Sequence, residues 1–243
     1  MLFRSIILCS NNEKCLKLNS KIISKIPGRL RESIAVNTPV MSEDENPDMI
    51  PIEILDTLDL PGIPPHKLEL KTGAIYMLIR NFNLKLGLCN GTRFQLLPSF
   101  SNKLLHGRVI PNTPLAPGER AVEFYLPRFD LDSPDDSVYK FRRRQFPIIP
   151  AHAVTINKSQ GSTFDLVGVD LRDNCFSHGQ VYTAFSRVRR FSSLKILLLP
   201  GRTSTKNIIN KAIISQPSHS ADIVLNLPED PFYYNQQDYE EQA

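Results

Sequence analysis

The chain has 243 residues, of which 41% are hydrophobic and 22% are charged, and its formal net charge at pH 7 is +4. This composition supports a sizeable core and excludes a wholly disordered, collagen-like or coiled-coil chain. No apolar run approaches the roughly 20 residues that cross a bilayer, and the apolar stretch at the N-terminus is too short for a signal peptide. The four cysteines lack C-x-x-C pairs and zinc-ligand spacing, so we expect an intracellular protein with reduced thiols and no metal site.

Charge is segregated along the chain. Residues 1–31 carry seven lysines and arginines against one acid, and residues 140–202 carry eleven against three. Residues 41–60 carry seven acids and no base, and residues 216–243 are expected to form an acidic, flexible tail. This pattern fits basic faces that attract a polyanion. Solvated helix faces would produce the same pattern, and charge alone favours that simpler interpretation.

The first predicted elements form an α/β unit. Ser5–Cys9 is a short apolar run, typical of a strand buried on both faces. Ser10 and Glu13 have the spacing of a capping box, and Pro27-Gly28 ends the helix that follows. The predicted apolar face of this helix is formed by Cys15, Leu18, Ile22 and Ile26. Residues 1–38 are therefore expected to open an α/β domain.

A β-rich insert is predicted next. Residues 39–65 are rich in proline and acid and are predicted to be a linker. An Asn-Gly pair at 90–91 is typical of a tight turn between strands. The strand-like runs are Ala74–Ile79, Arg93–Leu97 and Val122–Leu126. Short strands and turns without a helical pattern predict a small β insert over residues 66–135.

Residues 136–215 are predicted to return to α/β architecture. Pro150 suits a first helical turn, so Ala151–Ile156 is predicted to be helical. Ser177 is expected to cap a second helix, whose apolar face is formed by Val181, Ala184, Phe185 and Val188. Buried strands are predicted at Leu166–Leu171 and Leu194–Leu199.

Two polar groups in this region have the residue types of a phosphate site. Arg187 would project from an anchored helix beside Gln180 and Thr183, where a guanidinium can stabilise a transferring phosphoryl group. Lys158–Gly161 supplies a cation, a hydroxyl, an amide and a flexible backbone, and such loops often hold phosphates. By residue type alone, a solvent-facing arginine and an ordinary polar turn remain the favoured interpretations.

Particular stretches of sequence favour the phosphate-site interpretation over an ordinary surface arginine and polar turn. Residues 154–164 (VTINKSQGSTF) closely resemble motif V of the PIF-family (petite integration frequency) DNA helicases, and residues 177–190 (SHGQVYTAFSRVRR) resemble motif VI. Residues 60–74 (LPGIPPHKLELKTGA) and parts of 80–93 (RNFN…GLCNGTR) resemble the SH3-like β-barrel inserted in the second motor domain of that family. The resemblance covers about residues 2–214 and is nearest to the PIF-like helicase of Helitron transposons.

The resemblance implies an α/β fold: a second RecA-like domain of the P-loop-NTPase type, interrupted by an SH3-like β-barrel, from an ATP-dependent 5′-to-3′ DNA helicase. Arg187 matches the arginine finger and is the catalytic candidate. The other nucleotide-site candidates are Gln160, Gly161 and Gln180, and Tyr182 matches a position that couples the nucleotide to domain closure. The DNA-site candidates are Thr155, Asn157, Lys158 and Ser159. The implied cofactor is ATP with Mg²⁺, and the implied partners are single-stranded DNA and a first RecA-like domain, with no membrane.

Part of that machinery has no counterpart in this sequence. None of the 11 glycines is followed by lysine, so the phosphate-binding motif G-x-x-x-x-G-K-[ST] is absent. No acidic pair follows a buried strand, so Mg²⁺ ligands are expected on the first RecA-like domain. We therefore expect the C-terminal half of a helicase, inactive alone, that acts in DNA repair, recombination, telomere maintenance or transposition in the nucleus or mitochondrion.

Two alternatives remain open. In the first, the chain is a non-enzymatic nucleic-acid-binding remnant or accessory module and not part of a helicase enzyme. In the second, which has less support, it is a protein-interaction domain. Arg142–Arg144 could add DNA contacts, or form a localisation patch or a solvated turn.

Overall fold

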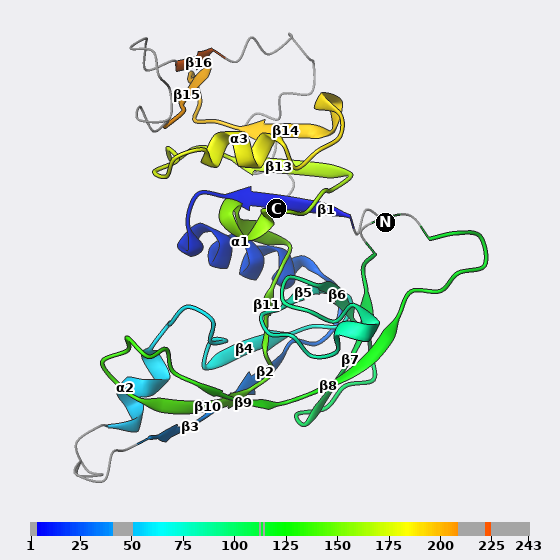
Figure 1. The fold of residues 1–243 in the computed structure, drawn as a ribbon, viewed down its shortest axis with the longest axis vertical. Helices are drawn as coiled ribbons and strands as arrows, with labels where there is room; N and C mark the ends of the chain where they lie inside the picture. Colours follow the sequence, from blue (N-terminus) through cyan, green and yellow to red (C-terminus); the bar gives the residue numbers. More distant parts are fainter. Residues whose placement is uncertain (1–3, 41–50, 112, 114, 209–221, 225–243) are drawn as a thin grey trace.

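The structure is a computed structural model that describes residues 4–40, 51–111, 113, 115–208 and 222–224. It has two adjoining parts, which we call the α/β part and the β part (Figure 1). The α/β part holds a parallel sheet with its helices and occupies the upper half of Figure 1, and the β part holds the antiparallel strands below it. Helix α1 (Asn12–Lys25) lies between the parallel sheet and the β part.

The α/β part is built on a four-stranded sheet in the order β12-β1-β13-β14, in which all neighbours are parallel. Its strands are β1 (Ser5–Cys9), β12 (Ala153–Thr155), β13 (Leu166–Asp170) and β14 (Leu194–Leu197). Its other short helices are η3 (Ile156–Ser159), α3 (Gln180–Phe185) and η4 (Phe191–Ser193). The predicted α/β class is confirmed, and the strands are apolar because helices and loops cover them.

The β part contains two antiparallel sheets and a strand pair. A five-stranded sheet has the order β11-β5-β6-β7-β8, formed by Ile148–Pro150, Ile75–Leu78, Arg93–Leu96, Leu104–Val109 and Glu123–Pro127. A three-stranded sheet has the order β3-β10-β9, formed by Val36–Pro39, Phe141–Gln145 and Phe129–Asp132. The pair is β2 (Arg31–Ile34) with β4 (Lys67–Leu70), and the short helices are α2 (Ile52–Thr57) and η2 (Leu84–Leu86).

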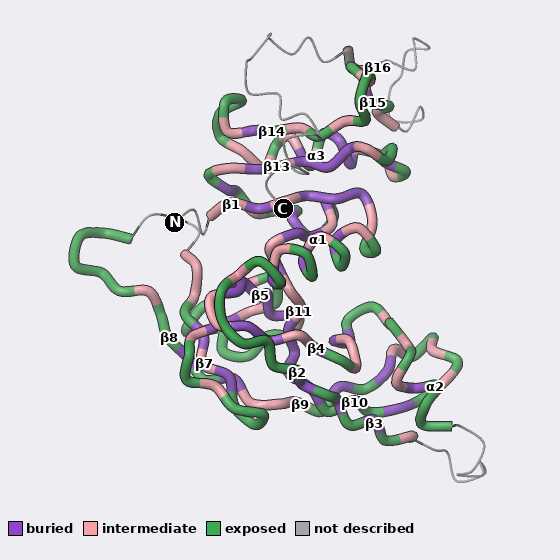
Figure 2. Tube along the Cα trace, turned by 180° about the vertical axis from the view of Figure 1, so that it is seen from behind, coloured by how far each residue is buried: buried purple, intermediate pink, exposed green. Residues whose placement is uncertain are grey.

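Buried residues follow the strands of both parts (Figure 2). One core fills the α/β part, where it includes the buried Leu8 and Val167, and it extends to Ile75 and Met77 on β5. A second core fills the five-stranded sheet, where Phe94 meets Phe124 edge to face at 5.1 Å between ring centroids. No described helix is both long enough and apolar enough to span a bilayer.

The β part extends beyond the predicted insert on both sides. Residues 31–38 and 141–150, which were assigned to the α/β domain, lie largely in β2, β3, β10 and β11, and β3 ends at Pro39 in the predicted linker. The predicted helix at 151–156 is wrong, because residues 153–155 form strand β12 beside β1. A short apolar run fits a buried strand as well as a helix, so periodicity alone does not separate the two.

The predicted linker is partly structured. Helix α2 inserts Leu55 into a small core with Ile63 and Phe141, and Leu55 is fully buried. Residues 51–65 are thus packed, and residues 41–50 lie outside the described residues. Within the predicted tail, residues 222–224 form β16, which pairs antiparallel with β15 (Ser204–Lys206), and the rest of the tail lies outside the described residues.

The predicted capping box of Ser10 and Glu13 is wrong, because helix α1 begins one residue later. Asn11 caps α1, since its side chain accepts a hydrogen bond from the backbone N–H of Lys14 at 2.9 Å. Glu13 pairs with Lys17, one helical turn on, at 2.6 Å.

Polar side chains join the two parts. The amide of Asn19, on α1, accepts hydrogen bonds from the N–H groups of His152 and Ala153 and donates to the Ala153 carbonyl at 2.7 Å. The guanidinium of Arg93, on β6, donates to the Ser5 carbonyl at 2.9 Å and the Ala151 carbonyl at 3.0 Å. The Arg93 contact to Ser5 attaches the β part to the first strand of the α/β part, and the Asn19 contacts attach α1 to the start of β12.

Candidate nucleotide and nucleic-acid site

The candidate residues gather where parallel strands end. In open parallel sheets, ligands bind beyond the carboxyl ends of the strands. Thr155 is the last residue of β12 and η3 follows it directly, so 155–159 lie at that edge of the sheet. The helix α3 is placed beside them, in contact with η3.

The motif V loop, residues 155–161, contains two buried residues with two exposed residues between them. Ile156 and Ser159 are buried, and the Ser159 hydroxyl donates to the Ile156 carbonyl at 2.6 Å. Asn157 and Lys158 are exposed between them, and Thr155 is half-buried. Ser159 therefore supports the turn with its hydroxyl, while Asn157 and Lys158 offer their side chains to a ligand.

Gln160 and Gly161 end this loop on the surface. Gly161 has φ +79, in the left-handed region that favours glycine, and nothing lies within 4 Å of a Cβ built there. The conformation, and not crowding, is what requires glycine at this position.

Gln180 connects the two motifs. Its side chain is buried at the start of α3, where Oε1 accepts from the N–H groups of Phe176 and Ser177. Its Nε2 lies 3.5 Å from Oδ1 of Asn157 on the motif V loop. Val181 and Ala184 are buried as predicted, whereas Tyr182 is 74% exposed. The cap of α3 is Gly179, and Ser177 is not the predicted N-cap.

Arg187 lies just past α3 and folds back onto the motif V loop. Its Nε donates to the Thr183 carbonyl at 2.9 Å, and Nη1 donates to the Ser162 carbonyl at 3.0 Å. A longer contact of 3.5 Å joins Nη1 to the Ser159 carbonyl. The backbone is linked as well, since Phe164 N–H donates to the Arg187 carbonyl at 2.9 Å. The guanidinium is therefore held at a defined place, half-buried, against the loop that follows β12.

The donor set at this edge suits a phosphate. Arg187 and Lys158 supply cations, Gln160 and Asn157 supply amides, and the loop backbone supplies N–H groups. Within the described ranges, no group of three or more His, Cys, Asp or Glu side chains could hold a metal ion. The residues present thus fit the phosphates of ATP, and ligands for its Mg²⁺ are not assembled by the part of the chain that the structure describes.

An ion cluster that sequence reasoning missed lies at the same edge. Asp170, the last residue of β13, is buried and pairs with Arg172 at 2.6 Å and with Lys14 at 3.7 Å. Burial raises the pKa of Asp170, but its hydrogen bonds to Arg172 and the charge of Lys14 outweigh burial and hold that pKa below its ordinary value. The signal that could have identified this cluster is an acid next to the last residue of the predicted buried strand Leu166–Leu171.

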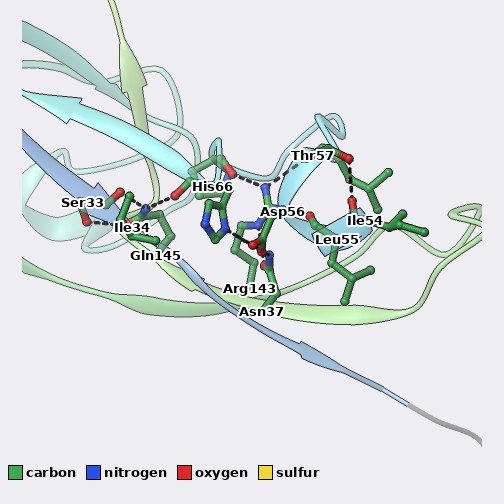
Figure 3. Close-up of polar contacts among 12 residues, drawn as sticks. Ser33, Ile34, Asn37, Ile54, Leu55, Asp56, Thr57, His66, Arg143 and Gln145 are labelled. Atoms are coloured by element: carbon green, nitrogen blue, oxygen red, sulfur yellow. Dashed lines mark hydrogen bonds and ion pairs between the residues drawn. The ribbon is translucent and has the colours of Figure 1, made fainter. Parts of the chain in front are cut away.

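The three consecutive arginines on β10 have different roles. Arg143 is fully buried and donates to Oδ1 of Asn37 at 2.8 Å, to the Leu55 carbonyl at 2.6 Å and to the Pro64 carbonyl at 3.0 Å (Figure 3). Its neighbours are exposed: Arg142 pairs with Asp132 at 2.7 Å and Arg144 pairs with Asp130 at 3.6 Å. None of the alternatives left open for these arginines, DNA contact, a localisation patch or a solvated turn, fits Arg143, because alternation along the strand turns its side chain inward.

The fold is the feature that solved structures share with this chain. Its parallel α/β sheet joined to an antiparallel β part has the RecA-like helicase fold of these neighbours. The structure aligns with a Pif1 helicase from Candida albicans at a TM-score of 0.60 and 24% identity, covering 79% of this chain and 44% of that one. It also aligns with a Pif1 helicase from Bacteroides in complex with ADP-AlF3 and ssDNA at a TM-score of 0.58 and 21% identity, covering 86% and 43%.

Sequence comparison identifies the family. Residues 53–97 match the family described as DNA helicase Pif1, 2B domain. The ATP-dependent DNA helicase PIF1 of Homo sapiens is 30% identical over 190 residues, which cover 78% of this chain. The chain belongs to the PIF family of DNA helicases. It spans 26% of the length of the human relative.

Proposed function

We propose that the chain forms a C-terminal part of an ATP-dependent 5′-to-3′ DNA helicase, in which Arg187 is the arginine finger and the motif V loop is part of the single-strand track. The observation that carries this proposal is the contact between the two motifs: Arg187 donates to the carbonyl of Ser162, directly after the loop. Arg187, which would contact a phosphate of ATP, is thereby connected to the loop that would bind DNA.

The proposed single-strand track would use the exposed side chains of the motif V loop. Lys158 and Asn157 are exposed there, and half-buried Thr155 lies at the end of β12. A cation and short polar side chains suit backbone phosphates, which are gripped without sequence preference. Buried Ser159 would fix the loop from beneath by its bond to the Ile156 carbonyl.

The nucleotide would lie on the other side of the loop, between this chain and a first RecA-like domain. Arg187, Gln160 and Gly161 would face its phosphates, and ATP would arrive with Mg²⁺ bound by that other domain. An arginine placed in this way contributes about 10³–10⁵ in rate in related phosphoryl-transfer systems. Exposed Tyr182 and buried Gln180 would transmit the closing of the two domains to Asn157.

The remaining parts fit the same proposal. The five-stranded antiparallel sheet would be the SH3-like insert of the family. The motor would act on nuclear or mitochondrial DNA, in repair, recombination, telomere maintenance or transposition.

The proposed track is tested by titrating the isolated chain with fluorescent single-stranded DNA at several salt concentrations. We expect affinity to fall steeply with salt, and Lys158→Ala to reduce the slope of log K against log salt by about 0.7, the value for one phosphate contact on a single strand. Lys103→Ala, an exposed lysine in the turn before β7, serves as the matched control and should leave the slope unchanged. A salt-independent affinity, or equal effects of both substitutions, would contradict the proposed track.

The enzymatic half of the proposal predicts that the isolated chain has no ATPase activity, with or without single-stranded DNA. The reason is that the sequence contains no Gly-Lys pair and so no phosphate-binding loop of the G-x-x-x-x-G-K-[ST] type. Turnover by the purified chain that is lost on Arg187→Ala would show that this view of an incomplete site is wrong.

The same absence favours a second candidate, a non-enzymatic nucleic-acid-binding module. The reading frame upstream of this sequence discriminates between the two. A phosphate-binding loop followed by an acidic motif on a buried strand would support the helicase, and a transcript without them would support the binding module.

A further inference from the structure

An exposed aromatic ring lies on the segment that leads from β13 into α3. Phe176 is 65% exposed, which makes it the most exposed phenylalanine in the part of the chain that the structure describes. The residue before it, Cys175, is buried in the core of the α/β part. Exposure of one apolar side chain is ordinary by itself, so its surroundings decide whether it has a binding role.

The backbone that carries this ring is fixed. Oε1 of Gln180 accepts hydrogen bonds from the N–H groups of Phe176 at 3.1 Å and of Ser177 at 3.3 Å. Gln180 and Cys175 are both buried, so the segment is attached to the core on each side of Phe176. A side chain on a fixed backbone loses less freedom on binding than one on a mobile loop, and more of its contact energy becomes affinity.

The same glutamine places Phe176 beside the proposed single-strand track. Nε2 of Gln180 lies 3.5 Å from Oδ1 of Asn157, which is exposed on the motif V loop. The Gln180 amide alone therefore separates the backbone of Phe176 from the Asn157 side chain. Lys158 comes next on the loop and is exposed as well. An aromatic residue, an amide and a cation thus lie at one edge of the sheet.

These groups complement one another for a strand of DNA, which presents bases as well as phosphates. The candidates on the motif V loop offer hydroxyls, an amide and a cation, and none of them is aromatic: Thr155, Asn157, Lys158 and Ser159. Proteins that hold single strands without sequence preference combine cations for the backbone with aromatic side chains on which bases stack. Phe176 supplies the aromatic side chain that the loop lacks.

Tyr182 is a second exposed aromatic residue of this region, but its position on α3 is different. Gln180, Val181 and Ala184 are the buried residues of α3. Tyr182 is two residues beyond Gln180, and this spacing places it on the opposite side of the helix from the amide that reaches Asn157. Phe176 is therefore the better candidate for a base contact beside the motif V loop.

We infer that Phe176 is a base-stacking residue of the single-strand track, and that one base of the strand stacks on its ring while neighbouring phosphates contact Lys158 and Asn157. This inference rests on the proposed function, to which it adds a base contact. Stacking on phenylalanine involves no charge, so its contribution to affinity does not depend on counterion release, in contrast to that of Lys158.

The stacking contact is tested by fluorescence. The chain contains no tryptophan, so Phe176→Trp introduces a single indole at the proposed contact. We titrate this variant of the full chain with a single-stranded thymidine oligonucleotide and expect its emission to be quenched, because an indole stacks on a base as a phenyl ring does. Phe191→Trp is the matched control: Phe191 is 63% exposed on η4, directly before β14 and so at the amino edge of the same sheet.

Three results of this titration would overturn the inference. The first is unchanged emission of Phe176→Trp at saturating DNA, and the second is equal quenching of the control. The third is quenching of Phe176→Trp by ATP without DNA, which would assign the ring to the adenine of the nucleotide.

Affinity for the same oligonucleotide is then compared in the parent and in Phe176→Ala, which keeps the backbone N–H that Gln180 binds. We expect the substitution to weaken binding at least about five-fold at every salt concentration and to leave the slope of log K against log salt unchanged. Phe176→Tyr keeps a ring and should bind like the parent. A strand of abasic sites should bind the parent and Phe176→Ala equally, and a difference between them on that strand, or a reduced salt slope, would contradict stacking.

The stacking contact and the proposed track fail in different ways. If Lys158→Ala reduces the salt slope while Phe176→Trp shows no quenching, the track stands and the stacking residue is wrong. If the parent chain binds no single-stranded DNA, the proposed function and the stacking contact are both wrong.

Discussion

Arg143 illustrates how a charged side chain can serve the fold alone. Every nitrogen of its guanidinium donates to a described acceptor: the Asn37 amide or a carbonyl of Leu55, Leu58 or Pro64. Five donors in a planar fork can satisfy several carbonyls of one irregular segment, which lysine cannot do. Asn37 in turn donates to Asp56 at 2.7 Å (Figure 3). Arg143 thereby attaches residues 55–64 to the three-stranded sheet.

Replacing Arg143 by alanine should destabilise the protein by about 3 kcal/mol, because it leaves several buried acceptors without donors. Arg142→Ala removes an exposed surface ion pair from the same strand and should leave the free energy of unfolding nearly unchanged. Urea denaturation of both variants measures the difference. Equal stabilities would contradict a structural role for the buried guanidinium.

His152 predicts a dependence of stability on pH. Burial, with a smaller contribution from the Arg93 charge, lowers its pKa to about 4, and Nε2 accepts a hydrogen bond from Ile75 N–H at 3.0 Å. An unfolded histidine titrates near 6.5, so between pH 6.5 and 4 the unfolded chain binds a proton that the folded chain does not. The contribution of His152 is therefore complete above pH 6.5 and is lost as the pH falls toward 4.

We expect this loss to be roughly 2 kcal/mol, less than the full shift implies because His152 is half-buried. The free energy of unfolding, measured by urea titration at several pH values from 4 to 7, reports it. His152→Gln keeps an acceptor without a titrating ring, so its stability should vary less over this window. Parallel profiles for the two proteins would rule out His152 as the source.

At the scale of elements, a glycine sets the packing of the five-stranded sheet. A Cβ at Gly107, on β7, would lie 2.6 Å from Phe94 and 2.9 Å from Phe124. Both rings are buried and pack edge to face, so neither moves freely. The strand β7 therefore approaches these rings in a way that only glycine permits.

Gly107→Ala should destabilise the protein by about 1–3 kcal/mol through overpacking. Gly168→Ala, on β13, is the matched control, because the Cβ there would meet only Ile7 at an ordinary 3.9 Å. Thermal unfolding followed by circular dichroism compares the two variants. A Gly107→Ala protein as stable as Gly168→Ala would show that the rings yield at little cost.

The sequence allowed some elements to be predicted and left others undecided, for physical reasons. The strands at β1 and β13 were predictable because a parallel strand covered on both faces is a continuous apolar run. Strand β12 was not, because the short run Ala151–Ile156 after Pro150 fits either state, and the Asn19 amide that fixes the extended form comes from far along the chain. Helix α2 was hidden in an acidic stretch, since Leu55 and a distant Arg143 hold it in place.

The candidate site was predictable from its sequence motifs, but its internal contacts were not. Resemblance placed Arg187 and the motif V loop in one site, and the structure brings them into contact. Which side chains face a ligand depends on the local fold: Ser159 and Gln180 turn inward, while Asn157 and Lys158 stay exposed. An acid near the end of a predicted strand was the local signal for the Asp170 cluster, but its partners Lys14 and Arg172 could not be predicted, because their placement depends on the tertiary fold.

At the scale of the whole molecule, Arg93 connects the two cores. It is buried on β6, donates to the Ser5 carbonyl on β1 and to the Ala151 carbonyl between β11 and β12, and stacks over Phe164 at 5.5 Å. Burial lowers its pKa to about 10, so it stays charged at neutral pH. The Arg93 guanidinium contacts both parts of the molecule. If the two parts separate, the carbonyls that accept its hydrogen bonds lose their donor, so unfolding of one part is coupled to unfolding of the other.

Arg93→Met should therefore weaken the coupling between the two parts more than it weakens either core. We expect the parent chain to unfold in one transition, and the variant to show two transitions, or proteolytic cleavage near residues 28–30 and 150–152 under conditions that leave the parent intact. Arg108→Met is the matched control, since Arg108 lies on the adjacent strand and pairs on the surface with Glu123 at 2.8 Å. If both variants unfold in a single transition with the same midpoint, the connection between the cores lies elsewhere, in the Asn19 contacts to residues 150–153.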